Sequence, residues 1–262
     1  MKIPTPVSLV AVLLAATFAH GAPADDVKNA AKKLSDAANY SWTATTQNAP
    51  PAAGAPAPAA GGRGGGFNAG PVEGKTEKGG YTIVTRALGG NAMQTVLKGD
   101  KRVQQGQDGT FMTPEEMAAA GNGGRGGGAA PVLPADEIAT LAGKVKELKA
   151  ADGVIAGDLP ADAVGPLLLA GRGGRGGGAA PATPPAPAEN ASGSLSIWLK
   201  DGALVKYAVH LKGTITGRNG MPTDVDRTVT TEIKDIGTTK FDVPAAAKDK
   251  LEAKPAAPPP AA

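Results

Sequence analysis

Few residues of this chain are of the types that carry out metal or redox chemistry. Its 262 residues include no cysteine and two histidines, one of which, His20, lies near the N-terminus. A Cys/His zinc site needs several such ligands at short spacing, so the sequence excludes one. His210 lies in a predicted strand on the face opposite the apolar row, and we expect it to face solvent. Asp224 and Asp226 do not match a calcium loop, and we expect them on the solvent face where a strand begins.

Three arginine-containing glycine tracts are the next candidates for chemistry. The hexapeptide Gly-Gly-Arg-Gly-Gly-Gly occurs at residues 61–66, 123–128 and 173–178. Such segments bind single-stranded nucleic acid when aromatic side chains stack on the bases, but only the first copy has an aromatic neighbour, Phe67. The glycine spacing also matches a dinucleotide-binding loop, yet no strand precedes it and no helix follows it. We therefore expect flexible loops and no nucleic-acid partner.

No motif for nucleophilic catalysis is present. The chain has no Gly-x-Ser-x-Gly sequence, and Ser192-Gly193-Ser194 lies where a loop joins a strand. A paired-carboxylate hydrolase stays open as an alternative, because its test is the geometry of scattered Asp and Glu residues. We predict a non-enzymatic protein without a cofactor or a metal.

The N-terminus has the pattern of a secretory signal peptide over residues 1–24. Lys2 precedes an apolar run at 7–18, and small residues follow, with cleavage after Gly21 or Ala24. The run is shorter than the roughly 20 residues that a membrane span needs, and no other stretch approaches that length. We expect an exported protein, periplasmic or extracellular, with no membrane span in the mature chain. An N-terminal anchor helix is the alternative.

Charge and cysteine content limit how the exported chain is held together. Only Lys2 of the 27 basic residues lies in the signal peptide, so 26 basic side chains stand against 24 acidic ones. This balance indicates no electrostatic partner. Without cysteine there are no disulfides, so stability must come from a hydrophobic core.

The residues after the signal peptide are expected to form one α+β domain over 25–251. Composition predicts flexible insertions at 49–71, 121–134 and 170–188 and a disordered Pro/Ala tail at 252–262. Helical periodicity predicts helices over 24–38, 135–148, 160–169 and 244–251, and Thr113 before Pro114 predicts a capped short helix. Strand patterns occur at 40–47, 72–77, 81–88, 92–98, 101–107, 193–200, 203–216 and 225–235. Asp201-Gly202 and Asn219-Gly220 mark hairpin turns, so the strands should form an antiparallel sheet.

Two apolar rows on one face of the C-terminal strands are candidate ligand contacts. They consist of Leu195, Ile197 and Leu199 and of Val205, Tyr207, Val209 and Leu211. The mid-chain helices add Ile138, Leu141 and Leu168. Plain core packing accounts for each of these residues, and lining of an apolar ligand site is the further role that we predict for them.

The layout resembles the exported lipid-binding carriers of the lipoprotein-localisation-factor type and their mycobacterial lipoprotein relatives. The resemblance lies in the helix-then-strand order at 24–47, in the segment SGSLSIWLKDGALVKY from 192 and in the segment KDIGTTKFDVPAAAK from 234. It implies a curved antiparallel sheet, an incomplete barrel whose concave side is closed by helices over a cavity for acyl chains. The chain departs from this pattern in lacking the cysteine that anchors the mycobacterial relatives and in having few aromatic residues for a cavity.

The sequence therefore predicts an exported binding protein for an apolar ligand, such as an acyl chain or a lipoprotein tail. The helices at 135–148 and 160–169 would form its lid. The alternative is a cell-envelope or surface interaction protein with a packed core, whose flexible tracts make the contacts.

Overall fold

The computed structural model describes residues 22–49, 70–88, 91–106, 108–120, 131–170, 186–216 and 220–253. The three glycine tracts, the predicted signal peptide up to residue 21 and the tail from residue 254 lie outside the described residues.

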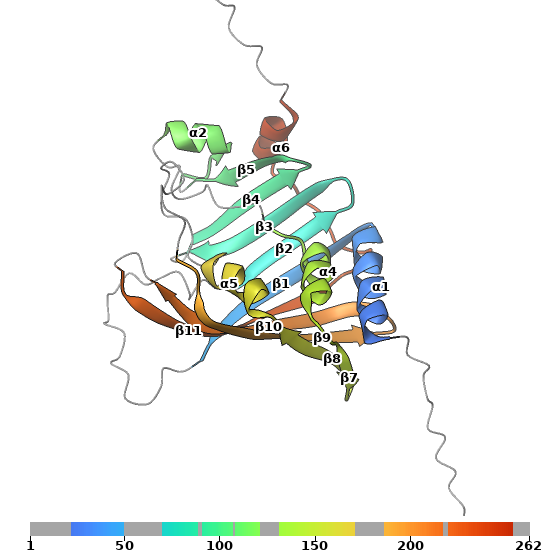
Figure 1. Cartoon of the computed structure of the whole chain (residues 1–262). Helices are drawn as coiled ribbons and strands as arrows, with labels where there is room; N and C mark the ends of the chain where they lie inside the picture. The colour runs from blue at the N-terminus through green and yellow to red at the C-terminus, as the bar shows by residue number, and fades with distance from the viewer. Residues whose placement is uncertain are drawn as a thin grey trace, which may run out of the picture.

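The described residues form one antiparallel sheet of eleven strands in the order β6-β5-β4-β3-β2-β1-β11-β10-β9-β8-β7 (Figure 1). Its two end strands, β6 and β7, are not paired with each other among the described residues, so the sheet is open. The predicted α+β class with a curved, open antiparallel sheet is confirmed. The strands are β1 (Asn39–Asn48), β2 (Val72–Glu77), β3 (Tyr81–Leu88), β4 (Asn91–Lys98), β5 (Lys101–Gln105), β6 (Phe111–Met112), β7 (Lys149–Ala151), β8 (Val154–Leu159), β9 (Glu189–Lys200), β10 (Ala203–Thr216) and β11 (Pro222–Lys234).

Strand β1 joins the two halves of the chain, because it pairs with β2 on one side and with β11 on the other. The hairpin of β9 and β10 turns at Asp201 and Gly202, whose φ angles are 54° and 69°. Positive φ at both positions is what a two-residue turn between twisted strands requires, and Asp-Gly adopts it readily. Residues 149–158, expected as a short strand with a turn at Asp152-Gly153, form the hairpin of β7 and β8 around that turn.

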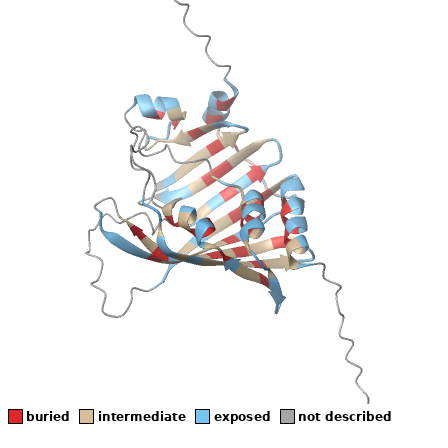
Figure 2. Cartoon of the chain, viewed as in Figure 1, coloured by how far each residue is buried: buried red, intermediate tan, exposed pale blue. Residues whose placement is uncertain are grey.

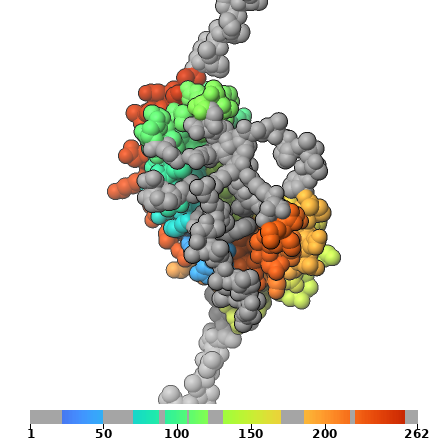
Figure 3. All heavy atoms as spheres, turned by 90° about the vertical axis from the view of Figure 1, so that its left-hand side faces the viewer, coloured from blue at the N-terminus to red at the C-terminus, as the bar shows by residue number. Residues whose placement is uncertain are grey.

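Helices cover both faces of the sheet. Figure 1 shows the sheet bent around α1 (Pro23–Asp36), α4 (Pro134–Lys144) and α5 (Ala161–Ala170), which lie on its concave face. Two short helices, α2 (Pro114–Ala119) and α6 (Ala245–Glu252), contact the β4–β6 end. In the space-filling view their green and red atoms lie at the end of the molecule opposite the orange β10–β11 hairpin (Figure 3). None of the described helices is long and apolar enough to cross a membrane.

The helix boundaries follow local chemistry. Thr113 caps α2 as predicted, and the structure adds a capping box with Glu116: the Glu116 backbone N–H donates to Thr113 Oγ1 at 3.3 Å, and the Thr113 N–H donates to Glu116 Oε2 at 2.8 Å. Helix α4 begins at Pro134, which lies in the predicted second insertion, because proline suits a first helical turn. It ends at Lys144 rather than at residue 148, since Val145 is already extended.

The alternation of β3 divides its apolar side chains between two cores. Val84 belongs to the concave core, while Ile83 joins a smaller cluster on the other face. Figure 2 shows buried segments, in red, on the strands and on the helices that pack against them. Helix α6 covers that smaller cluster through Ala247 and Leu251. The concave core is the larger one and contains all but one of the residues predicted to contact a ligand.

Candidate functional site

The concave face gathers most of the predicted ligand contacts into one apolar cluster. The sheet forms its floor, and α1, α4 and α5 form its cover. Leu199 is half-buried and packs against the cluster. The buried members among the predicted residues are Ile138, Leu141, Leu168, Leu195, Ile197, Tyr207, Val209 and Leu211.

Val205 is the exception, and its prediction as a member of the apolar row is wrong. The register between β9 and β10 shifts at this position, since Leu204 faces Leu199 whereas Lys206 faces Trp198. The extra residue is a β-bulge, which breaks the alternation on which the prediction depended. Leu204, only 1% exposed, enters the core in place of Val205.

Helix α5 is seated closely on the sheet above two glycines. A Cβ atom at Gly213 would lie 2.7 Å from Leu168 Cδ1, and one at Gly193 would lie 3.0 Å from Val164 Cγ2. Val164 and Leu168 are fully buried as a result. The absence of side chains at these two strand positions therefore lets α5 pack close to the sheet.

Helix α4 is tied to the floor by a polar contact. The Tyr207 hydroxyl of β10 donates a hydrogen bond of 2.5 Å to Glu137 Oε2 of α4. Burial raises the pKa of the half-buried Glu137 carboxyl, although the hydrogen bond from Tyr207 acts in the opposite direction. Burial and the nearby Glu137 carboxylate raise the pKa of Tyr207 well above its ordinary value. This pair places a proton donor and a carboxylate beside the apolar side chains of the core.

Tyr40 adds a second phenol to the same region. Its side chain is 3% exposed, and its ring lies 5.7 Å from that of Trp42, centroid to centroid. The hydroxyl is buried without a hydrogen bond of good geometry. Burial raises the pKa of Tyr40 to about 12, although the backbone of Ala135 in the first turn of α4 acts in the opposite direction. Tyr40 also raises the pKa of Tyr207, so the two phenols are electrostatic neighbours.

A buried arginine lies at the other end of the cluster. Arg227 of β11 is 7% exposed, and its Nη2 donates a hydrogen bond of 2.9 Å to the Leu167 carbonyl of α5. A cation beside a carbonyl near the end of a helix is favourable. Burial lowers the pKa of Arg227. Sequence reasoning missed this residue, although it occupies a core position in the alternation of its strand, between Val225 and Val229.

His210 and Asp226 meet on the convex face. His210 lies on the face opposite the apolar row, as expected, and the structure adds a partner, because its Nε2 lies 2.8 Å from Asp226 Oδ1 on the neighbouring strand. Both side chains keep more than a third of their surface exposed. Within the part of the chain that the structure describes, no three His, Cys, Asp or Glu side chains are grouped to hold a metal ion.

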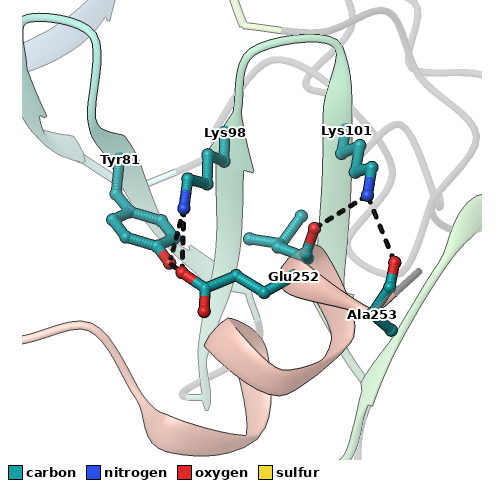
Figure 4. Close-up of polar contacts among 6 residues, drawn as sticks. Tyr81, Lys98, Lys101, Glu252 and Ala253 are labelled. Atoms are coloured by element: carbon teal, nitrogen blue, oxygen red, sulfur yellow. Dashed lines mark hydrogen bonds and ion pairs between the residues drawn. The ribbon is translucent and has the colours of Figure 1, made fainter.

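A polar cluster fastens α6 to the convex face, away from the candidate site (Figure 4). Lys98 Nζ lies 2.8 Å from Glu252 Oε1, and the Tyr81 hydroxyl donates to the same oxygen. Lys101 Nζ donates to the carbonyls of Leu251 and Ala253 at 3.1 and 3.3 Å, which satisfies the end of the helix. The hydrogen bond from Lys98 lowers the pKa of Glu252. These contacts are exposed and hold a structural element.

Comparisons with known proteins find likeness in structure alone. No protein-family profile matches the chain, and no characterised protein sequence matches it. The crystal structure of the lipoprotein LppX of Mycobacterium tuberculosis is similar with a TM-score of 0.41 and 7% identity, covering 84% of this chain and 97% of LppX. The structure of LprF from Mycobacterium bovis is similar with a TM-score of 0.42 and 12% identity, covering 86% of this chain and 97% of LprF. Both similar structures are mycobacterial, as are some of the lipoproteins that the sequence resembles, and at these TM-scores and identities the likeness transfers no residue role to this chain.

Proposed function

We propose that this protein is an exported, non-enzymatic binding protein that holds an apolar ligand, such as an acyl chain or a lipoprotein tail, between the concave face and its covering helices. The observation that carries the proposal is the convergence of floor and cover on one cluster. Leu195 and Ile197 from β9 meet Ile138 of α4 and Leu168 of α5 in it. Contact with such side chains would remove an acyl chain from water at about 0.8 kcal/mol per CH₂ group.

Helix α5 is the element of the cover that we expect to move. It contains Gly165 and Pro166, both of which weaken a helix, whereas α4 packs against α1 and is held by the Glu137–Tyr207 hydrogen bond. Segments of low intrinsic stability open locally at the smallest cost in free energy. We therefore propose that the ligand enters beneath α5, over Gly193 and Gly213.

The test is the binding of an apolar probe and the recovery of a natural ligand. Protein purified from its native compartment should release an acyl-containing molecule on extraction, as identified by mass spectrometry. After delipidation it should bind the uncharged probe N-phenyl-1-naphthylamine saturably, with fluorescence enhancement that long-chain compounds reverse. A protein that carries no apolar molecule and shows no saturable probe binding would refute the proposal.

A second candidate is a surface or envelope interaction protein with a filled core. The observation that favours it is the close seat of α5, since even a methyl group at Gly213 would approach Leu168 within 2.7 Å. An interaction protein would need the tracts at residues 50–69, 121–130 and 171–185 for its activity, whereas a carrier would bind its ligand without them. A variant with short linkers in place of all three tracts separates the two: retained probe binding supports the carrier.

A further inference from the structure

The Tyr40 hydroxyl has a proton with no acceptor. Its oxygen is buried, and no described group makes a hydrogen bond of good geometry with it. The Ala135 backbone N–H on α4 favours the ionised form of Tyr40 and so lowers its pKa, which means that this group acts as a donor toward the oxygen. The O–H of Tyr40 therefore still needs an acceptor, and a buried donor left without one costs free energy.

A carboxylate oxygen on the same helix is also open. Glu137 Oε2 accepts the Tyr207 hydrogen bond, while Oε1 accepts none from the residues that the structure describes. Glu137 lies in the first turn of α4, two residues after Ala135. Tyr40 neighbours the first turn of α4 at Ala135 and also Tyr207, the hydrogen-bond partner of Glu137. Through these two neighbours, one O–H donor from Tyr40 and one acceptor from Glu137 belong to the same polar end of the concave face, with the apolar floor beside them.

The unpaired Tyr40 donor and Glu137 acceptor determine which ligand head group can bind between them. A hydroxyl can accept from Tyr40 and donate to Glu137 at the same time, and it carries no charge. A carboxylate or phosphate can accept but not donate, and Glu137 repels it. An ammonium group can donate but has no lone pair for Tyr40. Arg227 does not offset the repulsion of an anion, because it lies four residues along β11 from Thr231, the partner of Tyr207, or roughly 13 Å away.

We propose that the Tyr40–Glu137 end of the site receives the hydroxyl head of an uncharged amphiphile, of the fatty-alcohol or monoacylglycerol class. Its chain lies along Ile138, Leu195 and Ile197. This inference rests on the proposed function, because it names the class of ligand that the apolar site prefers.

The experiment is a competition of matched chains for bound N-phenyl-1-naphthylamine. Dodecanol, dodecanoate and dodecylammonium share one chain and differ in the head group, and all are used below their micelle concentrations at mildly alkaline pH. Dodecanol should displace the probe at least about tenfold more tightly than dodecanoate, a ratio that one good hydrogen bond and one avoided charge contact can supply. Dodecylammonium can donate to Glu137 but leaves the Tyr40 O–H without an acceptor and brings a charge out of water, so it should also bind more weakly than dodecanol. Equal affinities for all three would overturn the inference and leave the proposed function standing, whereas no displacement by any of them would overturn both.

Two variants test whether the Tyr40 hydroxyl and the Glu137 carboxylate cause the preference for dodecanol. Tyr40→Phe removes the donor and should weaken dodecanol binding about threefold to tenfold while leaving dodecanoate unchanged. Glu137→Gln removes the charge and should strengthen dodecanoate binding. Tyr81→Phe is the matched control, because that hydroxyl is bound to Glu252 on the opposite face. Tyr40→Phe removes an unsatisfied hydroxyl, so the variant should still fold. Unchanged dodecanol affinity in a folded Tyr40→Phe protein would contradict the inference.

Discussion

One inserted residue decides which side chain enters the core near the start of β10. The bulge at Val205 places Leu204 beneath the cover and leaves Val205 half-buried outside the cluster. We expect Leu204→Ala to lower the free energy of unfolding by about 2–5 kcal/mol, because it removes buried volume. Val205→Ala should cost roughly 1 kcal/mol or less. Urea unfolding of the two variants tests this order, and a larger loss for Val205→Ala would place the bulge elsewhere.

Glu137 should make stability depend on pH. Its pKa in the folded protein is raised above the ordinary 4.5, so the folded state holds the proton more tightly than the unfolded chain. The resulting stabilisation is fully present below pH 4.5 and is lost as the pH rises through the folded pKa. Glu137→Gln cannot titrate, so the free energy of unfolding of wild type minus variant should fall with rising pH.

Glu252 provides a control of opposite sign for the Glu137 measurement. Its pKa is lowered by Lys98, so its contribution is present above the ordinary 4.5 and is lost as the pH falls through the folded value. The difference between wild type and Glu252→Gln should therefore rise with pH. Urea titrations of both variants over the acidic range measure the two slopes. A difference for Glu137→Gln that does not change with pH would show that this carboxyl is not buried in the folded protein.

At the scale of elements, the packing of α5 on the sheet leaves no room for a methyl group at Gly213. We expect Gly213→Ala to lower the free energy of unfolding by about 1–3 kcal/mol, because the added Cβ overlaps Leu168. Gly165→Ala lies in α5 itself and meets nothing within 4 Å, so it should raise stability by about 0.5–1 kcal/mol. Thermal unfolding compares the pair.

The same two variants report on how a ligand enters. If α5 is the moving element, loosening it with Gly213→Ala should speed the uptake of N-phenyl-1-naphthylamine, and stiffening it with Gly165→Ala should slow it. Stopped-flow fluorescence measures both rates. Equal rates in the two variants would indicate entry elsewhere, for example beside α4.

At the scale of the whole molecule, the sheet is continuous although the chain is interrupted three times. We expect replacement of residues 50–69, 121–130 and 171–185 by short flexible linkers to leave the melting temperature unchanged or slightly higher. Each halving of a flexible loop lowers its closure cost by only about 0.6 kcal/mol. Calorimetry of the shortened protein tests this. A large drop in melting temperature would show that the tracts contribute to the folded domain.

Local patterns predicted the strands and turns well, and long-range contacts account for what was missed. The burial of Leu195 and Ile197 follows from period-two alternation, which depends only on neighbouring residues. The bulge at Val205 has no such signature, because it depends on how β9 and β10 align. The contact of Glu137 with Tyr207 joins residues that are 70 positions apart, so no spacing rule predicts it.

The sequence by itself determined the fold class of the domain and the positions of some of its turns and helix ends. The Asp201-Gly202 turn and the Thr113 cap are set by a few adjacent residues whose preferences act in any context. The tertiary structure alone decided which face each helix covers: α5 lies over Gly193 and Gly213 on the concave face, and α6 lies on the other. Apolar alternation is the same whichever helix buries it, so only the packing of the whole chain brings Tyr40 and Glu137 to one end of the apolar face.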